Sequence, residues 1–119
     1  MKRLLKVVNY CYNKKITKSA IKVGLVHNSH IASIVGNTID GMVSSTEEAA
    51  INIKLDDFNT ITKAFVISNV IRGFTKAVNF DDVGANVGVP HYAYIYNNLV
   101  SGTIVGSDGK TYQDNNIQI

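Results

Sequence analysis

A strict alternation of residue types, which begins directly after the single proline, constrains the fold of this 119-residue chain most. In the segment HYAYIY, one set of alternate positions holds His91, Ala93 and Ile95, and the other holds Tyr92, Tyr94 and Tyr96. Side chains of a strand point to opposite faces with a period of two residues. The segment is therefore predicted to be a β-strand with one face of tyrosine.

The rest of the C-terminal third has the pattern of further strands. Asn97-Asn98 ends the tyrosine strand, and the apolar segment 99–105 is a second strand candidate. Gly106-Ser107-Asp108-Gly109 is typical of a hairpin turn, after which residues 110–113 return. The C-terminal third is therefore predicted to be an antiparallel β-meander.

The middle of the chain carries helical signals. Ser45-Thr46-Glu47-Glu48 has the spacing of a capping box, which predicts a helix start. Apolar residues then recur at steps of three and four from Ile61 to Val78, the spacing of one helix face. We expect one or two helices around residues 46–78. The many β-branched residues of AFVISNVI keep a strand open as the alternative over residues 57–78.

These elements together predict an α+β fold in a single domain, residues 1–119. Further strands are expected in segments 4–12 and 31–43. A hydrophobic content of 45% with 18% charged residues is ordinary for a folded protein. The sequence displays no evident repeat with a period of 20 to 50 residues, so one continuous fold is the simplest expectation.

The cysteine content and the apolar runs limit the cellular setting. Cys11 is the single cysteine, so no intrachain disulfide forms, and no Cys/His series has zinc-finger spacing. The apolar runs are far shorter than the roughly 20 residues that span a bilayer, and the opening lacks the cleavage site of an export signal. We expect no membrane association and a cytoplasmic location. The abundance of Asn, Ile and Lys also suits a phage or other virus, which would place the protein in the virion or the host cytoplasm.

The loop before the tyrosine strand carries a glycine motif. Asp82-Val83-Gly84-Ala85-Asn86-Val87-Gly88 resembles motif I of the class I S-adenosylmethionine-dependent methyltransferases. The resemblance implies a parallel sheet with helices, glycines that approach the cofactor, and an acid such as Asp108 at the ribose. Few residues follow Asp108, so the other interpretation is that Gly84 and Gly88 serve a turn. We prefer the turn and expect no cofactor.

The tyrosines and the basic N-terminal third are the candidate binding residues. Seven cations and no acid precede Asp40, whereas the remaining residues hold five cations and nine acids (5 − 9 = −4). Stacking rings beside a positive track are typical of single-stranded nucleic-acid binding, whereas alternating tyrosines also pack at subunit interfaces. The candidate residues are Tyr92, Tyr94, Tyr96, Tyr10, Tyr12, Lys14, Lys15 and Lys18.

Signals for catalysis or metal binding are sparse. His27 and His30 are spaced to share a metal on a helix, but no acid or cysteine nearby completes a ligand set. No nucleophile-elbow motif accompanies Cys11 or a serine. Neither a catalytic residue nor a metal site is predicted.

Three functions are compatible with these patterns. The first is a non-enzymatic assembly or interaction protein that forms a homo-oligomer, with an acidic protein as a further possible partner. The alternative is a small module that binds a nucleotide or single-stranded nucleic acid through tyrosine stacking and the N-terminal lysines. The third is a methyltransferase-like fragment.

Overall fold

The computed structural model describes residues 4–7, 10–12, 19–23, 31–43, 49–55, 63–82, 92–106 and 110–119. Every regular element in these ranges is a β-strand, and no helix occurs among them. The strands are β1 (Leu4–Val7), β2 (Tyr10–Tyr12), β3 (Ile21–Val23), β4 (Ile31–Val35), β5 (Thr38–Val43), β6 (Ala49–Leu55), β7 (Lys63–Ile67), β8 (Val70–Phe74), β9 (Lys76–Asp82), β10 (Tyr92–Tyr96), β11 (Leu99–Val100), β12 (Thr103–Gly106), β13 (Thr111–Asp114) and β14 (Ile117–Gln118).

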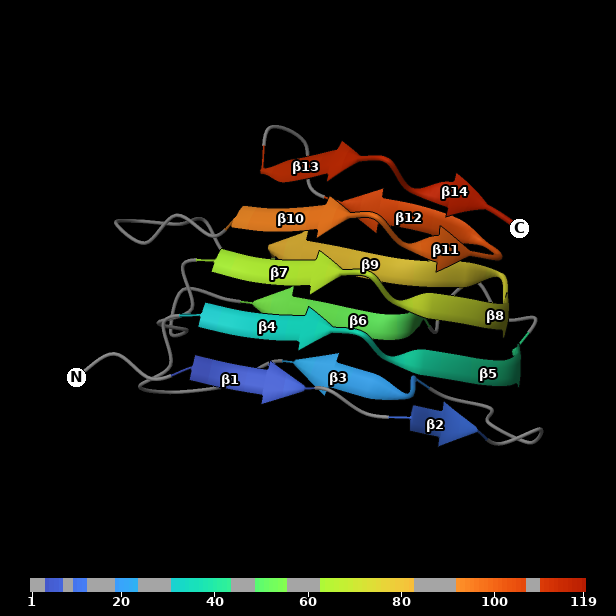
Figure 1. Ribbon diagram of the computed structural model, residues 1–119. Helices are drawn as coiled ribbons and strands as arrows, with labels where there is room; N and C mark the ends of the chain where they lie inside the picture. The colour runs from blue at the N-terminus through green and yellow to red at the C-terminus, as the bar shows by residue number, and fades with distance from the viewer. Residues whose placement is uncertain are drawn as a thin grey trace.

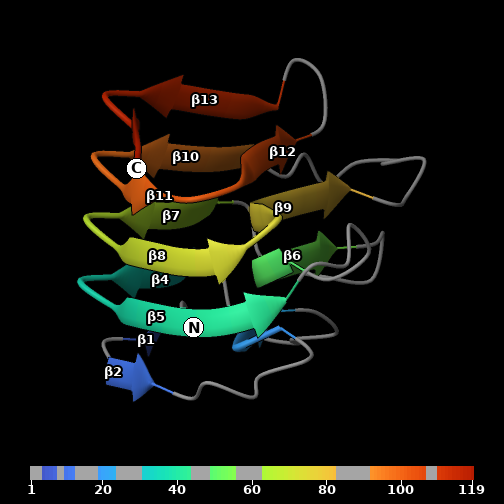
Figure 2. The same ribbon diagram turned by 90° about the vertical axis from the view of Figure 1, so that its right-hand side faces the viewer.

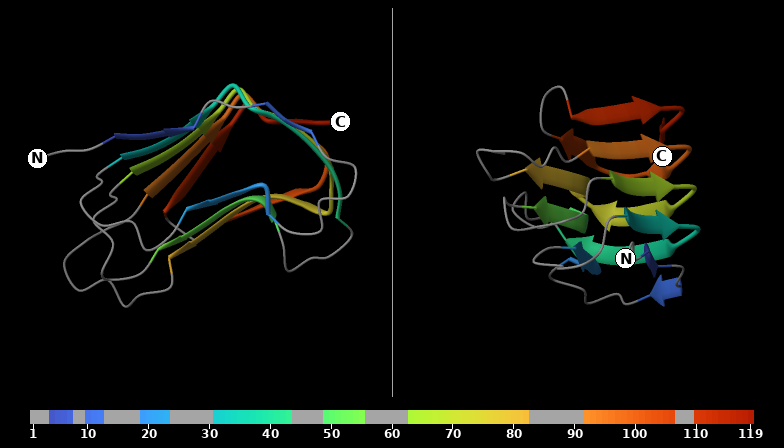
Figure 3. Two further views of the ribbon diagram at one scale, coloured as in Figure 1. Left: turned by 90° about the horizontal axis from the view of Figure 1, so that it is seen from below. Right: turned by 90° about the vertical axis from the view of Figure 1, so that its left-hand side faces the viewer.

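The strands wind into a parallel β-helix (Figure 1). Sheet A has the order β1-β4-β7-β10-β13, sheet B has the order β14-β11-β8-β5-β2, and sheet C has the order β12-β9-β6-β3. Consecutive strands pass from sheet A to sheet B to sheet C, and the chain then returns to sheet A one level higher. Figure 2 shows the stacked coils from the side. The left view of Figure 3 looks along the stack and shows that the three sheets surround one interior. Each coil of such a solenoid contacts its neighbours on either side.

The core consists of inward columns that run along the stack. In sheet A the register places Ala32, Ala64 and Ala93 in one column, and Ile34, Val66 and Ile95 in the next. All six side chains are fully buried. Parallel stacking in register brings residues of the same kind above one another. One column therefore holds only small alanine side chains, and the next holds only larger branched side chains. Sheet B continues the core with Ile39, Ile71 and Val100.

A column of asparagines lies at the corner between sheets A and B. Each is preceded by a residue with positive φ, namely Gly36 (72°), Ser68 (57°), Asn97 (58°) and Asn115 (53°). Glycine and asparagine adopt this left-handed conformation more readily than other residues do. The bend turns the next side chain into the interior, and in the four corners this residue is Asn37, Asn69, Asn98 and Asn116.

These four asparagines, the asparagine ladder, join successive coils by hydrogen bonds. The backbone N–H and Nδ2 of Asn37 donate to Oδ1 of Asn69 at 2.9 and 3.0 Å. Asn69 donates in the same way to Asn98, and Asn98 donates to Asn116. Nδ2 of Asn69 also donates to the Ile34 carbonyl at 3.0 Å. A buried polar group without a hydrogen-bond partner lowers the stability of the fold. The ladder avoids this cost because it pairs the asparagine amides and backbone N–H groups at the corner.

The predicted α+β class is wrong, and the helices predicted around residues 46–78 are strands in the described part of that range. β6, β7, β8 and β9 occupy residues 49–55 and 63–82. The left-handed residues Ser68 and Gly73 each shift the alternation of buried positions by one residue. Buried residues from Ala64 to Phe74 therefore recur at steps of two and three, and Ala64, Ile71 and Val78 are seven apart, which is close to two helical turns. The capping-box residues 45–48 lie outside the described residues.

The predicted antiparallel meander is also wrong, because every strand pairing of the C-terminal third is parallel. β10 pairs with β7 and β13, whereas β12 pairs with β9 in sheet C. β12 and β13, the strands on either side of the hairpin turn predicted at residues 106–109, lie in two different sheets. The tyrosine strand itself is confirmed as β10, and the strands expected in 31–43 are confirmed as β4 and β5. The strand expected over 4–12 is instead two strands, β1 and β2, which lie in different sheets.

The structure contains a repeat that the sequence pattern did not reveal. Successive ladder asparagines are 32, 29 and 18 residues apart. Because the spacing varies, comparison of the sequence with itself at one fixed period does not align the coils. The shared features are short: an alternating strand, a left-handed residue, and an asparagine.

Within the described ranges, no helix is long and apolar enough to cross a membrane.

Candidate interaction surface

The outer face of sheet A carries a cluster of aromatic rings. Along β10 the alanine and isoleucine are fully buried, so Tyr92, Tyr94 and Tyr96 point away from the core. The register sets Tyr94 beside Phe65 of β7 and beside Tyr112 of β13. We call this set the aromatic strip, and it comprises Phe65, Tyr92, Tyr94, Tyr96 and Tyr112.

The rings of the strip stack on one another along the axis of the coil. The centroid of Tyr94 lies 5.2 Å from that of Phe65 and 5.2 Å from that of Tyr112, with interplanar angles of 18° and 12°. Tyr96 meets Tyr94 edge to face at 6.2 Å, and Tyr92 lies 6.3 Å from Tyr112. Aromatic pairs of this geometry contribute about 0.5–1.5 kcal/mol each beyond their burial. Both faces of the Tyr94 ring are therefore covered by other rings of the same chain.

Aliphatic and charged residues surround the strip on the same face. Ile31, Val35 and Ile67 alternate with buried residues of β4 and β7 and are half-buried. Lys63 opens β7 in the column of Tyr92, and Asp114 closes β13 in the column of Tyr96. Both charged residues are exposed. The part of the face formed by β7, β10 and β13 is thus aromatic at its centre, with a cation and an anion at its diagonally opposite corners.

The candidate residues predicted from the sequence do not all meet at this surface. Tyr92, Tyr94 and Tyr96 lie on it together. Tyr10 and Tyr12 belong to β2, whose backbone pairs with β5 in sheet B, so their strand is not part of the same sheet. Lys14, Lys15 and Lys18 lie outside the described residues. The strands that carry the two groups of tyrosines therefore belong to two different sheets.

Two members of the strip, Phe65 and Tyr112, were missed by the sequence reasoning. Phe65 lay in the segment interpreted as helical, and Tyr112 lay in the expected return strand of a hairpin. The signal that identifies them is alignment of the coils by the asparagine that follows each strand. Counting back four residues from Asn69, Asn98 and Asn116 gives Phe65, Tyr94 and Tyr112.

The features considered for catalysis, metal binding and a cofactor are not assembled in the described part of the chain. No group of three or more His, Cys, Asp or Glu side chains that could hold a metal occurs there. Asp82 is the last residue of β9, and the glycines of the motif that follows it lie outside the described residues, as do His27, His30 and His91. The helices that the methyltransferase resemblance implies are absent from the described ranges.

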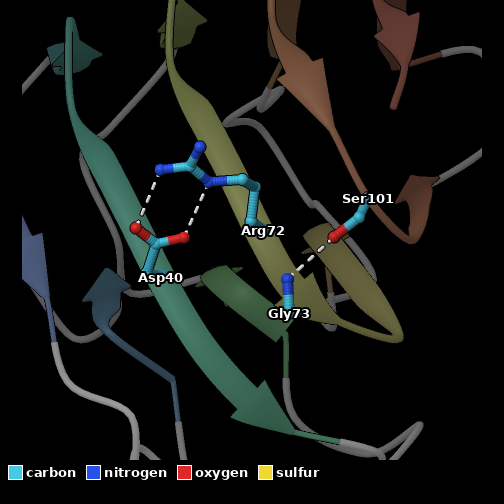
Figure 4. A network of polar contacts seen from close by, with 4 residues as sticks. All are labelled: Asp40, Arg72, Gly73 and Ser101. Atoms are coloured by element: carbon cyan, nitrogen blue, oxygen red, sulfur yellow. Dashed lines mark hydrogen bonds and ion pairs between the residues drawn. The ribbon is translucent and has the colours of Figure 1, made fainter.

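A separate polar contact lies on the outer face of sheet B (Figure 4). Nε of Arg72 donates to Asp40 Oδ1 at 2.7 Å, and its NH2 group donates to Oδ2 at 2.9 Å. The two residues are directly paired across β5 and β8. The arginine side chain is 54% exposed and the aspartate 20%. This is a cross-strand ion pair in contact with solvent, a geometry that favours the register of two strands.

The ion pair is expected to contribute little to stability. A double-mutant cycle with Arg72→Met and Asp40→Asn should give a coupling energy of about 0.5–1 kcal/mol, because solvent screens the pair. Urea unfolding followed by far-UV circular dichroism measures the four stabilities. A coupling above about 2 kcal/mol would instead indicate a desolvated pair.

Comparison of the chain with protein-family models, curated proteins and solved structures finds no match.

Proposed function

We propose that this protein is a non-enzymatic assembly protein whose copies associate through the outer face of sheet A. The observation that carries the proposal is the aromatic strip, with Tyr94 stacked between Phe65 and Tyr112. Tyrosine is enriched in protein–protein interfaces because it buries a large area while its hydroxyl remains hydrogen-bonded. The strip lies on a regular parallel sheet, which presents a flat and stiff surface to a partner.

The stacking of the rings supports a protein partner over a nucleobase. A base that binds by stacking needs an open ring face. Tyr94 has a ring on each side at 5.2 Å, so a base could enter only by separating rings that already stack. Ring edges and hydroxyl groups remain to face outward. Such edges pack against another apolar surface and donate or accept hydrogen bonds at its margin.

The charge arrangement supports a second copy as the partner. Lys63 and Asp114 are placed symmetrically about Tyr94, each one strand and two residues away in register, on opposite sides. A two-fold axis that lies in the interface, perpendicular to the line joining Lys63 and Asp114, therefore sets Lys63 of one copy opposite Asp114 of the other, twice. Two-fold interfaces require self-complementary patches of this kind. The inferred location remains the cytoplasm, or the virion and host cytoplasm for a viral protein.

Removal of the central ring is expected to weaken this association. Tyr94→Ser should raise the dissociation constant of the dimer at least about tenfold, because central aromatic residues contribute most of the binding energy in many interfaces. Sedimentation velocity over a concentration series measures the constant. The matched control is Leu99→Ser, which removes an apolar side chain of 38% exposure from sheet B and should leave the dimer unchanged.

A wild-type protein that is strictly monomeric at tens of micromolar would contradict the proposal, as would equal effects of Tyr94→Ser and Leu99→Ser. Circular dichroism of each variant checks that the coils remain folded. A high ratio of absorbance at 260 to 280 nm after purification, with salt-sensitive binding of single-stranded DNA, would favour the nucleic-acid function instead.

The charged corners provide an independent test of the two-fold arrangement. Lys63→Glu and Asp114→Lys should each weaken the dimer, because each places like charges together at low salt. The double variant restores opposite charges and should recover most of the affinity. Failure of the double variant to recover would contradict the proposed orientation while leaving the Tyr94 test valid.

A further inference from the structure

Among the described residues, the outer strands at the two ends of the coil have a neighbouring strand on one side only. β1, β2 and β3 are the last strands of their sheets at one end, and β13, β14 and β12 are the last strands at the other. Each sheet therefore begins with a strand of the first coil and ends with a strand near the C-terminus. An exposed strand edge is a template for pairing with another chain.

The asparagine ladder has unused donors at the C-terminal end. Each earlier asparagine donates its backbone N–H and its Nδ2 to Oδ1 of the next one. Asn116 accepts the bonds of Asn98 and donates Nδ2 to the Ile95 carbonyl at 2.8 Å. Its backbone N–H and the second Nδ2 hydrogen have no acceptor among the described residues. By the pattern of the three preceding steps, both donors are placed for the Oδ1 of an asparagine in a further coil.

Exposed apolar side chains gather at the same end. Among the residues whose exposure is described, the exposed large hydrophobic residues all lie in the last coils: Leu99, Val105, Tyr112, Ile117 and Ile119. Ile117 and Ile119 are 52% and 54% exposed. A coil stacked on this end would remove part of that surface from water, as each coil does for the one before it.

From these observations we infer that the C-terminal end of the coil binds the N-terminal coil of a second copy, in a head-to-tail contact that continues sheets A and B. The direction of the strands is then preserved, so the new pairings are parallel like those within the chain. In sequence, Asn9 directly precedes β2, as Asn37 directly precedes β5. Because the contact joins two different surfaces, it does not close on itself and extends into filaments.

The charge distribution favours head-to-tail contact over contact between two like ends. Residues 1–30 hold seven cations and no acid, so two N-terminal coils repel each other. Residues 92–119 hold one lysine and two aspartates, which gives 1 − 2 = −1. The opposite ends therefore attract, and the attraction should fall as salt screens it.

The observed register identifies a residue pair that reports this contact. Val100 pairs with Gln118 and with Ile71, Ile71 pairs with Ile39, and Ile39 pairs with Cys11. Continuing this column to a second copy places its Cys11 beside Gln118. Neighbouring parallel strands lie about 4.8 Å apart, which is within the range of Cα separations that a disulfide spans.

The test is disulfide trapping of the full-length Gln118→Cys variant with diamide, which takes up the two electrons and two protons of the thiol pair. The expected result is a series of covalent dimers, trimers and larger species, in which peptide mapping finds Cys11 joined to the thiol at position 118. Gln113→Cys is the matched control. It lies on β13 in sheet A, where the column ends at Val7 and holds no cysteine.

A second pair of variants tests the contact without a cross-link. Ile117→Lys and Ile117→Glu place opposite charges at one exposed position of the C-terminal end. The lysine should abolish filaments by repulsion from the seven cations, and the glutamate should retain them, as measured by sedimentation velocity at low salt. Equal behaviour of the two variants, or trapping that joins only position 118 to position 118, or no trapping at all, would overturn the inference.

These tests are separable from those of the proposed function. Tyr94→Ser acts on the face of sheet A and should leave the disulfide between Cys11 and position 118 unchanged. Ile117→Lys acts on the end and should leave the Tyr94-dependent dimer. The head-to-tail contact does not rest on the association through sheet A, so either can fail alone.

Discussion

Replacement of Asn69 by leucine should lower the free energy of unfolding by about 3–5 kcal/mol, because it breaks a buried hydrogen-bond network at its centre. Asn69 is fully buried, and its side chain takes part in bonds to the coils on both sides. Leucine leaves the Asn37 N–H without its Oδ1 acceptor and removes a donor from the Ile34 carbonyl. Water cannot reach these groups to replace the lost partners. Urea unfolding followed by far-UV circular dichroism measures the change.

Asn79→Leu is the matched control for the ladder variant. Nδ2 of Asn79 donates to Asn52 Oδ1 at 2.9 Å, so it too makes an asparagine–asparagine bond across neighbouring strands. That bond is only partly buried, and water can hydrogen-bond to Asn52 after the substitution. We expect a loss below about 1 kcal/mol. Equal losses for the two variants would show that the ladder contributes no more than an ordinary surface amide pair.

The alternation of single strands could be predicted from the sequence, whereas their pairing could not. Tyr92, Tyr94 and Tyr96 alternate with small or branched residues, and this local pattern correctly indicated β10. Which strand lies beside β10 depends on contacts to Lys63 and Thr111, at sequence distances that local patterns do not encode. The hairpin motif at residues 106–109 offered the shorter connection, and it is wrong because β12 and β13 pair in different sheets.

The helical prediction failed for a reason specific to a coil with corners. A strand alone buries every second residue, but the left-handed residues Ser68 and Gly73 each add one residue to that spacing. The buried positions then follow a mixture of two- and three-residue steps, which one helix face also matches. Of the aromatic strip, only Tyr92, Tyr94 and Tyr96 could be predicted from the sequence. Its other rings belong to strands that become neighbours only when the chain coils.

Gly73 occupies the most crowded backbone position among the described glycines. Its φ is +79°, and a Cβ added there would lie 1.7 Å from the carbonyl oxygen of Gly41 on the neighbouring strand. The Gly73 N–H also donates to Oγ of Ser101 at 2.9 Å (Figure 4). This hydrogen bond joins β8 to the residue that follows β11 in the next coil. No rotation of a side chain relieves a contact between Cβ and backbone. The two strands would have to separate.

Gly73→Ala should therefore destabilise the protein by at least about 3 kcal/mol, of which the left-handed conformation itself accounts for about 1–2 kcal/mol. Gly36→Ala is the control, because Gly36 also has positive φ, at 72°. The equivalent corners hold Ser68, Asn97 and Asn115, so a Cβ fits there and only the conformational cost remains. Denaturant unfolding of both variants should separate the cost of the left-handed conformation from the cost of the steric contact with Gly41. Equal losses would mean that the approach of Gly41 to Gly73 places no steric limit on the coil.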